Sequence, residues 1–77
     1  MTRLRTLVAE ILGVDPSIVT AETGPGTIPQ WDSMAHMQLV AAIEESYGVQ
    51  FTIEEIPTIM SIAELAALLE GKGVAIG

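Results

Sequence analysis

The segment Asp32-Ser33-Met34 is where covalent chemistry is easiest to place in this chain. A loop with several helix-breaking residues, 20–32, precedes it, and residues 35–47 after it contain no Gly or Pro. Ser33 is therefore expected at or next to a helix N-terminus, where free backbone N–H groups and a partial positive charge favour a nearby anion. A hydroxyl group there is well placed to carry a phosphate ester.

His36 raises a second possibility, because a serine and a histidine together can form a nucleophile and its base. By helical spacing, however, His36 falls within the core-facing stripe one turn after Ser33. No acidic residue is evidently placed to orient its imidazole, since Asp32 is better employed as a helix cap. We therefore favour a histidine at the edge of the core over a small serine hydrolase, and expect no catalytic residue.

Four helical segments must position these residues. An apolar face at helical spacing marks the first of them, which Gly13 ends. The second runs from about Ser33 to Tyr47, and a buried connector comes after it. A capping-box pattern at Thr52 opens a short third helix that Pro57 cuts off or kinks, and a similar pattern at Ser61 opens the last. The residues of the first apolar face are Leu4, Leu7, Val8, Ile11 and Leu12.

The pattern thus predicts an all-α fold, a small bundle of three longer helices and a short third one. With 77 residues it forms one domain, 1–77, with a core of about residues 3–70 and a flexible tail over 71–77. The long loop should be anchored in the core by Ile28. Trp31, directly before the cap, either packs over the helix entry, which we favour, or contacts a partner.

Helical spacing gives the second helix two apolar faces. Val40, Ile43 and Tyr47 form the core face, with Leu39 at its margin. Met34, Met37 and Ala41 lie on a different side, which the long loop or the short third helix covers, or which remains exposed as a docking face. Flexible methionines suit a surface that binds several partners.

Composition excludes several classes of function. The formal net charge is −7, from ten acidic and three basic residues, which disfavours nucleic acid and anionic membranes. It either favours docking on basic protein surfaces or only maintains solubility. Without cysteine, and with one histidine, the chain offers no disulfide and no ordinary zinc site, and we expect no metal. No segment approaches the apolar length of a membrane span, so a cytoplasmic protein is expected. We also expect it to be a monomer.

The chain resembles an acyl carrier protein from Leu4 to about Glu70. The similarity rests on Asp32-Ser33-Met34 after a long loop, within four helical segments of this length and order. It is supported by positions in and beyond the second helix: Leu39-Val40, Ile43-Glu44-Glu45, Tyr47-Gly48, Phe51, Ile62 and Leu65.

This resemblance implies a four-helix carrier fold with 4′-phosphopantetheine attached to Ser33 from coenzyme A. A phosphopantetheinyl transferase would use Mg²⁺ to direct the hydroxyl group onto the phosphate, and Asp32 would cap the helix and add charge at the contact. The terminal thiol of the arm would carry acyl or aminoacyl groups as thioesters. The partners implied are that transferase, an acyl-activating ligase or acyltransferase, and a synthase or other enzyme that uses the acyl group.

Some positions depart from the usual pattern. Members of fatty-acid synthesis often carry acidic residues at the positions of Ala35 and Gln38, and this chain has lost both charges. The Trp-Asp-Ser version looks more like stand-alone carriers of specialised pathways, such as polyketide, modified-amino-acid or surface-polysaccharide synthesis. We expect Trp31, Met34, Met37, Gln38 and Ala41 to form the partner surface.

Two further expectations concern the acyl group that is carried and the class of protein. His36, at the edge of the acyl cavity, would narrow or polarise that cavity and favour a short or polar cargo. The competing class is a small acidic helical adaptor, which binds partners through the Met34 and Met37 face and never carries a prosthetic group.

Overall fold

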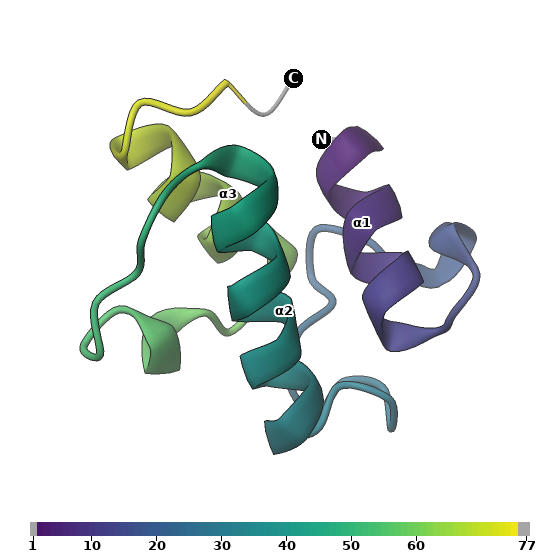
Figure 1. Ribbon diagram of the computed structural model, residues 1–77. Helices are drawn as coiled ribbons and strands as arrows, with labels where there is room; N and C mark the ends of the chain where they lie inside the picture. The colour runs from purple at the N-terminus through teal and green to yellow at the C-terminus, as the bar shows by residue number, and fades with distance from the viewer. Residues whose placement is uncertain (1, 76–77) are drawn as a thin grey trace.

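The computed structural model describes residues 2–75, and all the regular elements in that range are helical. Figure 1 shows α2 at the centre, with α1 on one side and α3 with η2 on the other. The expected all-α class is confirmed. The three α-helices are α1 (Thr2–Leu12), α2 (Ser33–Tyr47) and α3 (Ile62–Gly71), and the two 3₁₀ helices are η1 (Pro16–Ile18) and η2 (Ile56–Thr58).

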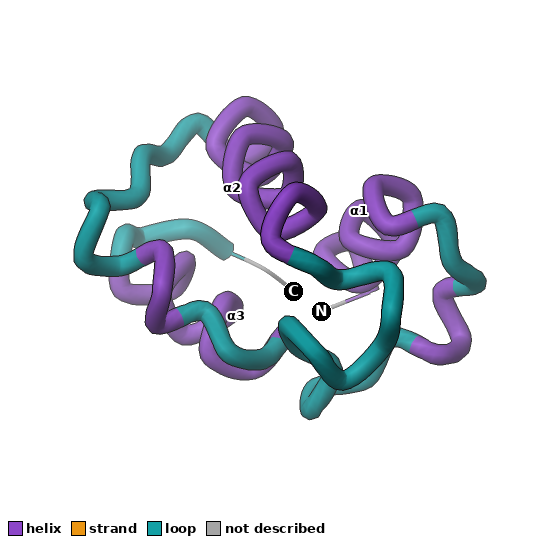
Figure 2. Tube along the Cα trace, turned by 90° about the horizontal axis from the view of Figure 1, so that it is seen from below, coloured by secondary structure: helices purple, strands orange, loops and turns teal. Residues whose placement is uncertain are grey.

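The core lies where the apolar faces of the three α-helices meet, and α2 contributes a wider face than its spacing alone indicated. Leu39 is 2% exposed and lies well inside the buried face, whereas Tyr47 is only half-buried. Because α2 has neighbours on both sides (Figures 1 and 2), a broad stripe of its surface is covered. The least exposed core residues of the helices are Leu4, Val8, Ala9, Leu39, Ile43, Ile62, Leu65 and Leu69.

The expected short third helix is a turn over residues 53–55 followed by η2. Its capping box does form: the Thr52 N–H donates to Glu55 Oε1 at 2.8 Å, and the Glu55 N–H donates to Thr52 Oγ1 at 3.2 Å. Pro57 lacks an N–H and disfavours α-helical backbone at Ile56, so the chain does not continue as an α-helix. The residue at which the sequence predicted a break is the one that limits the segment to a single 3₁₀ turn.

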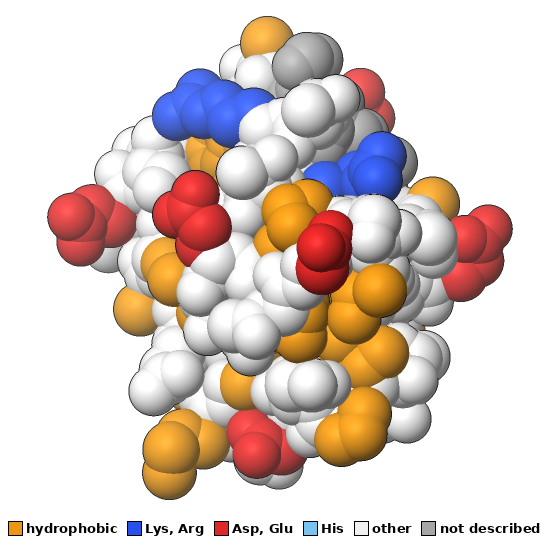
Figure 3. Space-filling view, turned by 90° about the vertical axis from the view of Figure 1, so that its right-hand side faces the viewer, with side chains coloured by type: hydrophobic (Ala, Val, Ile, Leu, Met, Phe, Trp, Pro, Cys, Tyr) orange, Lys and Arg blue, Asp and Glu red, His pale blue; other side chains and the backbone are white. Residues whose placement is uncertain are grey.

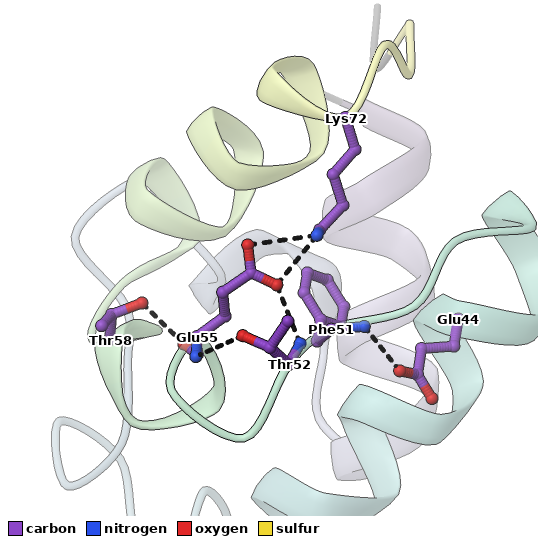
Figure 4. Close-up of polar contacts among 6 residues, drawn as sticks. All are labelled: Glu44, Phe51, Thr52, Glu55, Thr58 and Lys72. Atoms are coloured by element: carbon purple, nitrogen blue, oxygen red, sulfur yellow. Dashed lines mark hydrogen bonds and ion pairs between the residues drawn. The ribbon is translucent and has the colours of Figure 1, made fainter.

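The connector between α2 and the Thr52 turn is buried as expected, with Phe51 8% exposed. Its path is held by the Glu44 carboxylate, which accepts a hydrogen bond from the Phe51 N–H at 2.8 Å (Figure 4). Gly48 ends α2 in the left-handed conformation, φ 66°, which glycine adopts without steric cost. This glycine lets the chain turn back toward α3.

The long loop has a defined path, and it covers the N-terminus of α3. The Ile62 N–H donates to Thr23 O at 2.8 Å, and the Ala63 N–H donates to Ala21 O at 2.9 Å. These two bonds satisfy N–H groups that lack a partner within their own helix. The expected anchor, Ile28, is only partly buried, and it is Trp31, 1% exposed, that fills the core. An indole buries more apolar surface than an isoleucine, which explains why the loop closes on the tryptophan.

Two of the basic side chains make contacts within the molecule. Arg5 Nε donates to Val19 O at 2.7 Å, and the Arg3 guanidinium lies 4.7 Å from the centre of the Tyr47 ring. Figure 3 shows acidic side chains spread across one face of the molecule, with basic ones gathered near its top.

After α3, Lys72 connects the end of the helix to the Thr52 turn. Its Nζ lies 2.8 Å from Glu55 Oε1 and 3.1 Å from Oε2 (Figure 4). The Val74 N–H donates to Leu69 O at 3.0 Å, and the Val74 side chain packs against the core. Residues 76 and 77, the end of the segment expected to be flexible, lie outside the described residues.

Glu55 should make stability depend on pH. The hydrogen bond from Lys72, and then that from the Thr52 N–H, lower the pKa of the Glu55 carboxyl group. Since the pKa is lower in the folded than in the unfolded chain, the stabilisation is present above the unfolded value and is lost as pH falls through the folded value. Lys72→Met should raise the pKa of Glu55, measured by NMR titration of its carboxyl carbon, whereas Lys72→Arg should preserve the lowering. An unchanged titration in Lys72→Met would contradict the assigned cause.

Candidate functional site

Ser33 is the first residue of α2, and its side chain is exposed. Asp32 is the N-cap, with extended backbone (φ −96°, ψ −173°), and its Oδ1 accepts the Ala35 N–H at 2.9 Å. The Asp32 carbonyl group accepts the His36 N–H, also at 2.9 Å. The cap thus takes neither the N–H of Ser33 nor that of Met34, and both remain at the positive end of a 15-residue helix. This geometry fits a phosphate group esterified to the Ser33 oxygen.

His36 is held at both ring nitrogens. The Trp31 Nε1–H donates to His36 Nδ1 at 3.0 Å, and His36 Nε2 lies 3.0 Å from Ile56 O. An indole nitrogen only donates and a carbonyl oxygen only accepts, so these partners assign the neutral tautomer with hydrogen on Nε2. Neither nitrogen is free to accept a proton from Ser33. The imidazole is thus a structural group at the edge of the core, as the sequence favoured.

An open groove of about 580 Å³ begins at Ser33 and lies between the first turns of α2 and the segment 56–60. The size is within the range of small-molecule sites. The buried side chains of Trp31 and Ile59 belong to its lining, while Met37 and Met60 are exposed beside it. A group attached to Ser33 therefore has an apolar surface directly next to it. A second hollow, about 490 Å³ near Glu64 and Lys72, has none of the predicted site residues in its lining.

The second apolar face of α2 is exposed. Met34 is 72% and Met37 54% exposed, and Gln38 and Ala41 are exposed as well. Neither the long loop nor segment 52–60 covers this face, so the alternative in which they do is wrong. The structure brings these four residues to one accessible side of the helix that Ser33 begins.

Two residues that the sequence placed near partners are buried. Trp31 is 1% exposed, which favours its packing role and removes it from the partner surface. Ala35, one of the two positions at which the resemblance led us to note a missing acidic residue, is 8% exposed. A carboxylate there would be costly without a partner, because burial of a charge loses its hydration. Of the two missing charges, only the one at Gln38 would have been on the accessible surface.

Other kinds of site find little support in residues 2–75. That part of the chain holds no cluster of three or more His, Asp or Glu side chains arranged to bind a metal ion. None of its helices combines the length and the apolar character needed to cross a membrane. The fold and site together define a small helical domain with an exposed serine at a capped helix start, beside an apolar groove.

Comparison with known proteins places this class. Residues 31–69, half of the chain, match the family described as "Phosphopantetheine attachment site". The acyl carrier protein of Bdellovibrio bacteriovorus is 32% identical over 73 residues, 95% of this chain and 94% of the relative. That of Phaeodactylum tricornutum is 33% identical over 69 residues, 90% and 91% of the two chains. The solution structure of a holo acyl carrier protein from Nitrosomonas europaea has a TM-score of 0.76 at 29% identity, covering 92% of both chains.

The chain belongs to the acyl carrier protein family. The prosthetic group of this family is 4′-phosphopantetheine, and the matched segment contains Ser33. Members are carriers and not catalysts, which agrees with a histidine whose two ring nitrogens are already engaged.

Sequence reasoning missed two contacts at the site. The bond from His36 to Ile56 O joins residues 20 positions apart, and a backbone carbonyl carries no side-chain identity to recognise. The approach of Gly24 to the backbone at Met60 is equally hidden, although a glycine in a long loop hints at a close approach.

Proposed function

We propose that Ser33 is the attachment site of 4′-phosphopantetheine and that the protein presents acyl or aminoacyl groups to partner enzymes of a specialised biosynthetic pathway. The observation that carries the proposal is the exposed Ser33 hydroxyl group at the capped start of α2, on the rim of an apolar groove. The bound arm would supply a thiol that holds acyl groups as thioesters, which the cysteine-free chain cannot do itself.

Loading would be carried out by a phosphopantetheinyl transferase with Mg²⁺. The Ser33 oxygen forms a bond to the phosphorus next to pantetheine, and the diphosphate bond of coenzyme A breaks. Adenosine 3′,5′-bisphosphate leaves with the bonding electron pair, and the hydroxyl proton is released. Asp32 keeps the helix start ordered by holding the Ala35 N–H, so that the serine is presented in one orientation.

The accessible face of α2 supports the choice of partners. This face would bind the transferase, an acyl-activating ligase or acyltransferase, and the enzymes that use the acyl group. Its residues are Met34, Met37, Gln38 and Ala41. Gln38 offers no negative charge to the arginines that dock on fatty-acid carriers, which supports a specialised pathway. The expectation of a cytoplasmic monomer is part of the same proposal.

Intact-mass spectrometry tests the attachment site directly. After incubation with coenzyme A, Mg²⁺ and a broad-specificity phosphopantetheinyl transferase, the wild-type protein should gain one phosphopantetheine, and Ser33→Ala should gain none. Ser46→Ala, at an exposed serine near the other end of α2, should still be modified. If folded wild-type protein gained no mass while a known carrier was modified alongside, the adaptor function, which the exposed Met34 and Met37 favour, would replace this proposal.

A further inference from the structure

The segment 52–60, between α2 and α3, is bonded to neighbouring elements at two points, by an ion pair and by a hydrogen bond. On one side Lys72 pairs with Glu55, as Figure 4 shows. On the other side His36 donates to Ile56 O. This segment forms the side of the groove opposite α2, so the ion pair and the hydrogen bond hold that wall of the groove in place. The residues that line it are Ile56, Pro57, Ile59 and Met60.

The bond from His36 to Ile56 O belongs to a continuous chain of hydrogen bonds. The Trp31 Nε1–H donates to His36 Nδ1, and the His36 Nε2–H donates to Ile56 O. The hydrogen-bond chain joins the end of the long loop, the first turn of α2 and η2. Trp31 is 1% exposed, and its indole N–H donates to His36 Nδ1, which leaves the hydrogen on Nε2 and so holds the imidazole in the form that donates to Ile56 O. Moving segment 52–60 away from α2 would break the bond from His36 to Ile56 O, so the movement is opposed by a part-buried hydrogen bond as well as by packing.

Beneath the groove the interior is filled by core side chains. Ile59 and Leu39 are each 2% exposed, and Ile62 and Leu65 are 0% and 1% exposed. A long acyl chain that started at Ser33 and entered the core would have to pass between α2 and segment 56–60. That is the boundary that the Trp31–His36–Ile56 hydrogen-bond chain crosses.

We propose that this hydrogen-bond chain determines cargo class: it keeps the core closed, so the acyl group carried by the arm lies in the open groove and is a short one. The inference rests on the proposed attachment to Ser33. Met37 and Met60, exposed beside the groove, provide adaptable apolar contacts for such a group. His36 acts here as a specificity-determining residue and takes no part in bond making.

The test compares butyryl and octanoyl groups, attached through stable amide analogues of acyl-coenzyme A and verified by intact mass. In wild-type protein the octanoyl chain should show nuclear Overhauser contacts to the Met37 and Met60 methyl groups and none to Ile62 or Leu65. Its unfolding equilibrium constant should stay within about twofold of that of the butyryl form. Burial of each methylene group would instead favour the folded state about fourfold.

Two variants assign the effect to the hydrogen-bond chain. In His36→Ala the octanoyl chain should reach Ile62 and Leu65, and octanoyl should stabilise the protein at least about tenfold more than butyryl. Trp31→Phe keeps an aromatic ring but removes the N–H donor, and it should also allow the octanoyl chain to contact Ile62 and Leu65. Glu45→Ala, at an exposed position on α2, should behave as wild type.

The outcomes separate the two proposals. A protein that gains no mass rejects the carrier function and this inference with it. A loaded wild-type protein whose octanoyl chain contacts Ile62 or Leu65 rejects the inference alone, whether or not the variants fold. If the octanoyl chain stays outside the core in the wild-type protein and also in folded His36→Ala or Trp31→Phe, the hydrogen-bond chain does not keep the core closed, and its role is overturned.

Discussion

Trp31→Ala should lower the free energy of unfolding by about 3–5 kcal/mol, the range found when a large buried aromatic side chain is removed. Trp31 is the largest fully buried side chain among the described residues, and it closes the long loop over the start of α2. Its loss also leaves His36 Nδ1 without its donor. At about 0.05–0.15 kcal/mol per residue, the whole stability of 77 residues is about 4–12 kcal/mol, so the substitution removes from about a quarter of that stability to all of it.

Urea unfolding followed by far-UV circular dichroism measures this change without relying on the tryptophan that is removed. Met34→Ala is the matched control, because Met34 is 72% exposed three residues away, and should change stability by no more than about 0.5 kcal/mol. A Trp31→Ala variant as stable as Met34→Ala would show that the indole does not anchor the loop.

Gly24→Ala should be the second most damaging change, with a loss of about 1–3 kcal/mol, as for overpacked sites. A Cβ at Gly24 would lie 1.9 Å from Met60 O and 2.6 Å from Met60 C, and both atoms are backbone. The loop would have to withdraw from α3. Withdrawal would break the bonds that Thr23 O and Ala21 O accept from the first turn of α3.

Hydrogen exchange gives a local measure of the same event, since the amides of Ile62 and Ala63 should lose protection in Gly24→Ala. Gly71→Ala is the control: a Cβ there meets nothing within 4 Å, and alanine is the better helix former. It should be neutral or stabilise by up to about 1 kcal/mol. If Gly24→Ala unfolded at the same urea concentration as Gly71→Ala, the close approach of the loop to α3 would be refuted.

Local patterns in the sequence were sufficient for the three α-helices and for the placement of Ser33. The apolar spacing of α1, the Asp32 cap and Gly48 each act within a few residues, so their effect is visible without knowledge of the neighbours. The same holds for the capping box at Thr52, which forms as its spacing predicted. After this box the sequence predicted a short helix that Pro57 cuts off or kinks, and the chain forms a turn followed by a single 3₁₀ turn instead.

The chain by itself determined that a capped helix begins at a serine and that methionines occupy a second face of that helix. Only the tertiary structure decided that this second face is open, that Ala35 is buried, and that His36 bridges Trp31 and Ile56 O. The physical reason is that helix starts and caps are local hydrogen-bonding choices. Exposure and the partners of a buried imidazole instead depend on which distant segments pack against the helix, and that is settled by the core as a whole.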